Sequence, residues 1–255
     1  QAEIVPSDFY TIKNQGSGKV LDISGGSYGD SGNVQQYNAN GTLAQTFFLS
    51  YSASTGYYTI YTANSGRVLD VSGASDANGA NVQQFGSNGT AAQRWSLVKN
   101  ADGSYSFFSA VGGKALDVSG GSKSSGANVQ VYSSNGTAAQ RWILTRVDRW
   151  LPEGAYTITS TVNFGNVLDV ANGATSAGSN VQLYSGNSTN AQRFYLAPVS
   201  GGYYTLQNTV TGKFIAPVKT ASGANVVLSS HSYLWKPVLS TNGVVFRSKE
   251  NNSIV

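Results

Sequence analysis

Four aspartates recur along this chain, and the same polar residues follow each of them at fixed distances. Asp22, Asp70, Asp117 and Asp169 each lie third in a run of the type Val-Leu-Asp-Val. A Gln follows thirteen residues later, an aromatic residue fifteen later and a second Gln twenty-three later. A carboxylate accepts hydroxyl hydrogen bonds, an amide donates and accepts them, and a flat ring covers C–H groups. The combination predicts sites for polyhydroxyl ligands such as sugars.

These residues need a scaffold that presents each set in the same way. The Asp residues are 48, 47 and 52 residues apart, and every repeat opens with an aromatic and β-branched run such as residues 57–60. Three further short runs follow, so the pattern predicts four strands per repeat. Asn-Gly pairs between the third and fourth runs predict hairpin turns. One repeat is too small to bury its apolar side, whereas three repeats supply twelve strands, enough for a closed barrel.

Two further repeats have diverged. A fifth keeps the scaffold pattern but has Ala216 at the Asp position, and we expect it not to bind. A sixth begins at Gly243, and by alignment Val255 immediately precedes its Asp position. The second group of three repeats is therefore expected to be incomplete.

The order Leu-Asp-Val, then Val-Gln-x-aromatic, then Gln-x-Trp or Gln-x-Phe resembles the ricin B-type lectin family, in a cysteine-free bacterial form. The resemblance covers the chain from about residue 8 to its end. It implies an all-β fold of two tandem β-trefoils. Residues 1–148 would hold repeats one to three, and residues 149–255 would hold repeats four, five and the start of six. The charged, proline-containing residues 146–153 are interpreted as the join.

In that family the Asp and the aromatic residue after Val-Gln contact the sugar, and here the Gln residues would support the Asp or the sugar. The family's sugar-contacting Asn usually precedes the last Gln, where this chain has Ala44, Ala92, Ala139 and Ala191. We hypothesise that an Asn five residues before that Gln replaces it. The expected sugar-binding set is Asp22, Gln35, Tyr37, Asn40, Gln45, Asp70, Gln83, Phe85, Asn88, Gln93, Asp117, Gln130, Tyr132, Asn135, Gln140, Asp169, Gln182, Tyr184, Asn187 and Gln192.

Structural interpretations stay open beside these. Each Asp could instead fix its own turn by accepting from backbone N–H groups. The Gln-x-Trp and Gln-x-Phe motifs suit a shared core, and the Asn-Gly pairs suit turns. Phe85 lacks a hydroxyl, so the second site would be weaker or differently selective. If no site binds, the chain is a pseudo-lectin acting as a protein-interaction or spacer module.

Other functions are disfavoured. The carboxylates lie in separate repeats, too far apart to act on one bond, so we expect a non-enzymatic protein with no catalytic residue. The chain has one His and no Cys, and no carboxylate cluster has ligand spacing, so we expect neither a metal nor a cofactor. A net charge of +4 without charge runs argues against nucleic acid, and no apolar stretch reaches the length of a membrane span.

The expected partner is a carbohydrate, either polysaccharide or glycoconjugate, bound at several sites. Secretion or the cell surface, in a Gram-positive bacterium, is the expected location. An enzyme domain elsewhere in the parent chain would fit this role. The identity of the sugar and the oligomeric state stay open.

Overall fold

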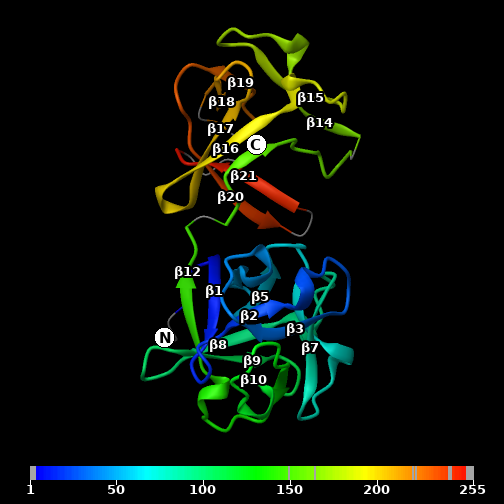
Figure 1. The fold of residues 1–255 in the computed structure, drawn as a ribbon, viewed down its shortest axis with the longest axis vertical. Coiled ribbons are helices and arrows are strands. Elements are labelled where there is room, and N and C mark those ends of the chain that lie inside the picture. Colours follow the sequence, from blue (N-terminus) through cyan, green and yellow to red (C-terminus); the bar gives the residue numbers. More distant parts are fainter. Residues whose placement is uncertain are drawn as a thin grey trace. The chain divides into compact units, whose positions relative to one another are not determined.

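The computed structural model describes residues 4–148, 150–163, 165–219, 221, 223–240 and 243–250. These residues form an all-β fold, as predicted, whose only helical segments are three-residue 3-10 turns (Figure 1). The chain divides into two compact units, unit 1 (Gln1–Trp150) and unit 2 (Leu151–Val255). The sequence predicted the boundary after residue 148, two residues before the observed one. Trp150 belongs to unit 1 because its ring stacks on that of Phe9, with ring centroids 4.1 Å apart.

Six strands of unit 1 pair in a closed ring. They are β1 (Asp8–Asn14), β4 (Phe47–Ser52), β5 (Tyr57–Thr62), β8 (Trp95–Lys99), β9 (Tyr105–Ser109) and β12 (Trp142–Arg146). Each strand pairs with the next in this order, and β12 returns to pair with β1. Figure 1 shows β1 and β12 side by side. A closed ring leaves no strand edge open to other chains.

Three hairpins cover one end of this ring. They pair β2 (Val20–Ile23) with β3 (Gly32–Tyr37), β6 (Val68–Val71) with β7 (Ala80–Phe85), and β10 (Ala115–Val118) with β11 (Val129–Tyr132). β7 pairs with both β3 and β11, and a bridge between Gln35 and Asn128 joins β3 to β11. Each repeat thus gives two strands to the ring and one hairpin to the cap, which are the four strands predicted.

The asparagines of the three hairpins join where the hairpins meet. Asn33 donates to Asn128, Asn128 to Asn81 and Asn81 to Asn33, each through Nδ2 to Oδ1 at 2.9–3.0 Å. Every member of this Asn triad gives one hydrogen bond and accepts one. The triad therefore needs one Asn from each of three repeats.

The predicted Asn-Gly hairpins are wrong. The third strand of a repeat pairs within the cap and the fourth within the ring, so the two do not pair with each other. The Asn-Gly pair lies in the loop that joins these two layers. Gly41, Gly89 and Gly136 adopt φ angles of 72°, 70° and 68°, so the preference for glycine was read correctly although the turn was not.

The last motif of each repeat supplies the core. Phe47, Trp95 and Trp142 are fully buried in unit 1 and lie opposite a tyrosine of a first strand. The Trp95 indole donates to the Leu69 carbonyl, and the Trp142 indole donates to the carbonyl of Leu116. The aromatic residue of Gln-x-Trp is therefore structural in this chain.

Unit 2 repeats this arrangement with fewer strands. Its ring-type strands are β13 (Gly154–Tyr156), β16 (Phe194–Val199), β17 (Tyr203–Asn208), β20 (Trp235–Ser240) and β21 (Gly243–Ser248), paired in that order. Its hairpins pair β14 (Asn166–Val170) with β15 (Asn180–Ser185), and β18 (Phe214–Pro217) with β19 (Val226–Ser229). Phe194, Tyr204 and Trp235 are buried in its core. Ile254 and Val255, at the end of the predicted sixth repeat, lie outside the described residues.

Candidate functional site

Each repeated Asp lies in the short second strand of its repeat, and the hairpin fixes its first Gln opposite it. Asp22 pairs with Gln35 across β2 and β3, and the same register recurs in the other three intact repeats. The spacing of thirteen residues therefore follows from the length of the hairpin. Because opposite residues in a sheet project their side chains to the same face, the carboxylate and the amide meet.

The four carboxylates are buried and are held by side-chain amides. The first Gln donates to Oδ1 of its Asp in every intact repeat, at 2.8 Å for Gln35 and Asp22, and at 2.9–3.1 Å in the others. The second Gln donates to Oδ2 in repeats one, two and four, at 3.0–3.1 Å. Within the described residues these carboxylates accept from no backbone N–H and form no ion pair. No hydrogen bond among the described residues therefore supports the interpretation in which each Asp fixes its own turn.

The second Gln of each intact repeat is buried, and in repeats one, two and four it positions the Asp. Gln45 donates to the Asn38 carbonyl as well as to Asp22, and its Oε1 accepts from the backbone N–H of Asn40. Gln93 and Gln192 make the same three bonds, while Gln140 makes the two backbone bonds only. Of the two expected roles, supporting the Asp or the sugar, Gln45, Gln93 and Gln192 therefore support the Asp.

Open hollows lie beside three of the four sets. They have volumes of about 740 Å³ at Asp22, about 610 Å³ at Asp117 and about 430 Å³ at Asp169. Each contains the Asp, its first Gln, the predicted tyrosine and the predicted Asn of one repeat. Tyr37 and Tyr132 are exposed in their hollows, as is Tyr184, whereas Phe85 of the second repeat is half-buried. The structure thus assembles four separate sets and brings no two of the Asp residues into one hollow.

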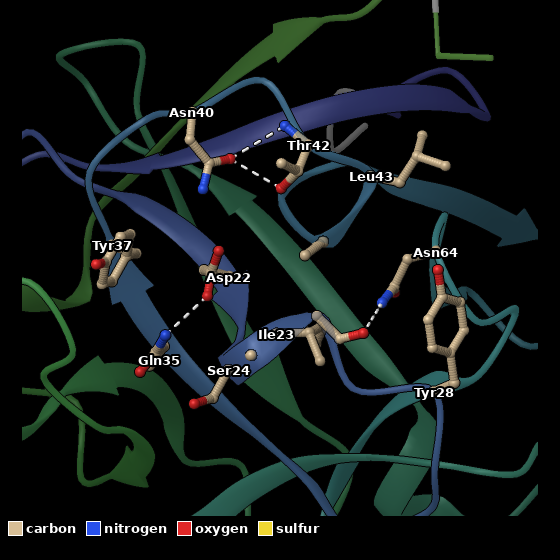
Figure 2. Close-up of a pocket in the computed structure, with 13 residues that line it drawn as sticks. Asp22, Ile23, Ser24, Tyr28, Gln35, Tyr37, Asn40, Thr42, Leu43 and Asn64 are labelled. Carbon is tan, nitrogen blue, oxygen red and sulfur yellow. Dashed lines mark hydrogen bonds between the residues drawn. The ribbon is translucent and has the colours of Figure 1, made fainter. Parts of the chain in front are cut away.

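The recurring Asn has one end fixed and one end free. Asn40 Oδ1 accepts from the backbone N–H of Thr42 at 3.0 Å and from its hydroxyl at 2.8 Å. The same turn forms at Asn88, Asn135 and Asn187. Figure 2 shows the Asn40 Nδ2 group pointing towards the space above Asp22, and no described residue accepts from it. The amide therefore offers a donor to the hollow without the swing that the hypothesis supposed.

The alanines that stand where the family usually has Asn also line the hollows. Ala44 lies in the first, Ala139 in the third and Ala191 in the fourth. Their side chains supply no hydrogen bond. The Nδ2 group of the turn Asn is therefore the amide donor above the carboxylate in each hollow.

Sequence reasoning missed three residues that make the hollows differ. Tyr28 is 70 % exposed and faces Tyr37 across the first hollow, and Asn64 enters the same hollow from the next repeat (Figure 2). Lys123 lines the third hollow. Tyr28 and Lys123 both lie six residues after the repeated Asp, where the second repeat has Asp76 and the fourth has Thr175. Aligning the repeats and asking where they vary would have found this position.

The loop that carries Tyr28 is clasped by the second repeat. Arg67 Nε bonds Asp30 Oδ1 at 2.6 Å, its guanidinium also donates to the Tyr28 carbonyl, and the Gly86 N–H donates to the same Asp30 oxygen at 2.9 Å. The hydrogen bond from Arg67 holds the pKa of Asp30 below its ordinary value. The exposed Arg67–Asp30 pair therefore fixes the position of this loop and of the Tyr28 ring in the first hollow.

Neither a metal-binding cluster nor a membrane-spanning helix is present among the described residues. No group of three or more His, Asp or Glu side chains there is placed to hold a metal ion. None of the helical segments described is long and apolar enough to cross a membrane.

Several solved structures are similar to this chain. The designed 3-fold symmetric protein ThreeFoil is 40% identical, over 55% of this chain and 99% of that one, with a TM-score of 0.53. The exo-beta-1,3-galactanase 1,3Gal43A of Clostridium thermocellum is 35% identical, over 57% of this chain and 31% of that chain, with a TM-score of 0.54. A ricin B-like lectin of Macrolepiota procera in complex with lactose is 21% identical, over 57% and 99%, with a TM-score of 0.50, and shows likeness of fold alone.

A search of curated proteins found no match. The family model described as ricin-type beta-trefoil lectin domain-like matches residues 3–85, 91–150 and 138–229. These matches cover most of the chain and contain every residue of the four Asp sets except Asn88. The protein therefore belongs to the ricin-type β-trefoil lectin domain-like family.

Proposed function

We propose that the protein is a multivalent carbohydrate-binding lectin module of two tandem β-trefoils, the second incomplete in its sixth repeat. One observation carries the proposal. Side-chain amides hold a carboxylate at the floor of an open hollow, with an exposed ring on one side and a free amide donor above it. Membership of the lectin family supports the same conclusion.

The unused capacity of each carboxylate fits adjacent hydroxyl groups. Each oxygen of Asp22 accepts one amide hydrogen, at 2.8 Å from Gln35 and 3.0 Å from Gln45, and so keeps one further acceptor site. Two hydroxyls on neighbouring sugar carbons can donate to these two sites. Tyr37 then covers the C–H face, and Asn40 Nδ2 donates to a sugar oxygen. The half-buried Gln35 and the buried Gln45 keep the carboxylate from rotating.

The arrangement suits attachment better than catalysis. A hydrolase of this type needs two carboxyl groups at one bond, and each hollow found contains one repeated Asp. We propose that the module attaches a secreted or wall-associated protein of a Gram-positive bacterium to glycans. The matching stretch covers only 31% of the exo-galactanase chain, which is consistent with an enzyme domain elsewhere in the parent chain of this module.

A glycan panel tests the proposal. Lactose is the first probe because a relative's structure contains it, followed by galactose, mannose, xylose, galactan and wall polysaccharides. The full chain is expected to bind at least one, and a variant with Asn at positions 22, 70, 117 and 169 is expected not to. Affinity for polymer should exceed that for the monosaccharide, because linked sites rebind. Equal affinities would contradict multivalent binding.

A spacer or protein-interaction module is the second candidate. The alanines in place of the family Asn favour it, because a missing amide partner can cost about 1 to 3 kcal/mol at a shallow site. Failure of the whole panel, with the chain folded, would select this function over the first.

A further inference from the structure

The first hollow extends beyond the residues that the four Asp sets share. Its volume is about 740 Å³, against about 430 Å³ for the fourth hollow, although both contain an Asp, a Gln, a Tyr and an Asn at the same repeat positions. Gln35 and Tyr37 lie two residues apart in β3, so both project to the face of the hairpin that carries Asp22. The shared residues therefore occupy one side of the first hollow, and other residues form its remaining wall.

That remaining wall is particular to the first hollow. Figure 2 shows Tyr28, Leu43 and Asn64 on the side away from Tyr37, with Asp22 nearer to Tyr37. Asn64 comes from the following repeat, as its counterpart Gly16 does for the third hollow. The three corresponding positions are Asp76, Ala91 and Val111 for the second repeat, Lys123, Ala138 and Gly16 for the third, and Thr175, Asn190 and Val210 for the fourth. The first repeat is thus the one intact repeat with a second aromatic ring and a large apolar side chain at this wall.

The backbone around Tyr28 is fixed by side chains of the second repeat. Asn64 Nδ2 donates to the carbonyls of Gly26 and Ser27, each at 3.1 Å. Arg67 donates to the carbonyl of Tyr28 itself. Because both amide hydrogens of Asn64 are used in these bonds, Asn64 positions the ring and does not donate to a ligand.

A comparison with the third repeat separates what is general from what is particular. The fully buried Gln84 donates to two carbonyls of the Tyr28 loop, and Gln36 donates in the same way to two carbonyls of the third loop. At the positions of Asn64 and Arg67, however, the third loop meets Gly16 and Lys19, and Lys19 bonds Asn38 instead. The additional contacts therefore coincide with the loop that carries the exposed ring. A ring on a fixed backbone loses little conformational entropy when a ligand stacks on it.

We propose that the first hollow binds a glycan of at least two linked sugars, one held by Asp22 and stacked on Tyr37, and the next stacked on Tyr28 beside Leu43. A single sugar that contacts Asp22 and Tyr37 leaves Tyr28 uncovered, because the two rings lie on opposite sides of the hollow. The C–H face of a second sugar fits the Tyr28 ring, and the Tyr28 hydroxyl, which has no described partner, can donate to a sugar oxygen. The inference rests on the proposed lectin function and adds the length of glycan that one of its sites takes.

A chain with one intact site tests the proposal. The substitutions D70N, D117N and D169N leave a repeated carboxylate in the first hollow only. Galactose, mannose and xylose are titrated beside lactose, β-1,3-galactobiose, mannobiose and xylobiose. At least one disaccharide is expected to bind about fivefold more tightly than the sugar it contains, as one further stacked ring would give. The ring resonances of Tyr28 should shift with that disaccharide and not with the monosaccharide.

Three variants of this chain assign the preference to the second wall. Tyr28→Ala should bring the two Kd values together, because the second sugar loses its ring. Asn64→Ala should reduce the preference in part, because the loop loses two hydrogen bonds while the ring remains. Thr175→Ala, at the position of Tyr28 in the fourth repeat, is the matched control and should leave the preference unchanged. Urea unfolding reports whether each variant is folded.

The outcomes separate this inference from the lectin function. Equal Kd values for each monosaccharide and its disaccharides would overturn the inference and leave sugar binding standing. A preference that survives Tyr28→Ala would overturn it too, as would an equal preference in a chain with D22N, D70N and D169N, where only the third hollow is intact. A folded chain that binds none of these sugars, single or linked, would overturn both proposals.

Discussion

Replacing Asp22 with Asn separates the ligand role of the carboxylate from its structural role. Asn keeps one oxygen, which can still accept from Gln45 Nε2, now at 3.0 Å from Asp22 Oδ2. Its new amide nitrogen faces Gln35, whose Oε1 has no described partner and whose side chain is half-buried. Gln35 can turn its amide over and accept from the new nitrogen. Gln45 cannot, because both ends of its amide are bonded.

The two readouts should therefore diverge. Since both amide contacts are kept, the free energy of unfolding should change by less than about 1 kcal/mol. Sugar binding loses charge-assisted hydrogen bonds and one acceptor, a cost of about 2 kcal/mol, or roughly 30-fold in Kd. The background chain has Asn at positions 70, 117 and 169, so that only the first hollow contributes.

Calorimetric titration with lactose, or with whichever sugar of the panel binds, gives the change in Kd, and urea unfolding gives the stability. Asp148→Asn, an exposed carboxylate, is the matched control and should alter neither. A Kd that stays within threefold while the chain remains folded would refute the role of the carboxylate. A large loss of stability would instead refute the argument that Gln35 can reverse.

Three further predictions follow from the same contacts. Gln93→Ala leaves a carboxylate oxygen, a carbonyl and an N–H without their partner, so the free energy of unfolding in urea should fall by about 3 kcal/mol. Gln83→Ala removes one hydrogen bond and should lower it by about 1 kcal/mol. Equal losses would contradict the positioning role of Gln93. In the single-site background, Tyr37→Ala should weaken sugar binding by about 1 kcal/mol, whereas Tyr37→Phe should leave it unchanged, because the ring face makes the contact with the sugar. Weaker binding by the Phe variant would show that the hydroxyl contributes. Because the pKa of Asp30 is lowered in the folded chain, the clasp of the Tyr28 loop is complete above the ordinary Asp pKa of about 3.9 and is lost as the pH falls through the lowered value. The Gly86 amide resonance should follow that transition, and Arg67→Met should move it up towards 3.9; a midpoint at or above 3.9 before mutation would count against the clasp.

The repeat pattern predicted the strands and the grouping of the site residues because both depend on local sequence. Asp22 and Gln35 are thirteen residues apart because they lie opposite each other in one hairpin, so their contact could be inferred from the sequence. The Asn-Gly loop was misread because a turn residue reports only a positive φ, while the partner of each flanking strand is decided by contacts with other repeats.

The missed residues depend on the same kind of distant contact. Asn64 belongs to the second repeat but lines the first hollow, and Arg67 holds the Tyr28 loop from that repeat as well. A pattern that recurs in every repeat identifies what the hollows share. Tyr28 and Lys123 fall at a position that varies, so repetition alone gave no signal for them.

The closed strand ring of unit 1 should determine which part of the chain a protease cleaves first. β1 is hydrogen bonded to β4 and to β12, so peeling away the N-terminal strand disrupts the last strand of the unit too. Pairings between such distant segments make unfolding a concerted and slow event, and a protease must wait for it. Among the described strands of unit 2, β13 and β21 each pair along one edge only, so cleavage should begin in unit 2 and leave a resistant fragment. That fragment would retain three of the four Asp sets, so the proposed sugar binding should last as long under proteolysis as unit 1 stays folded.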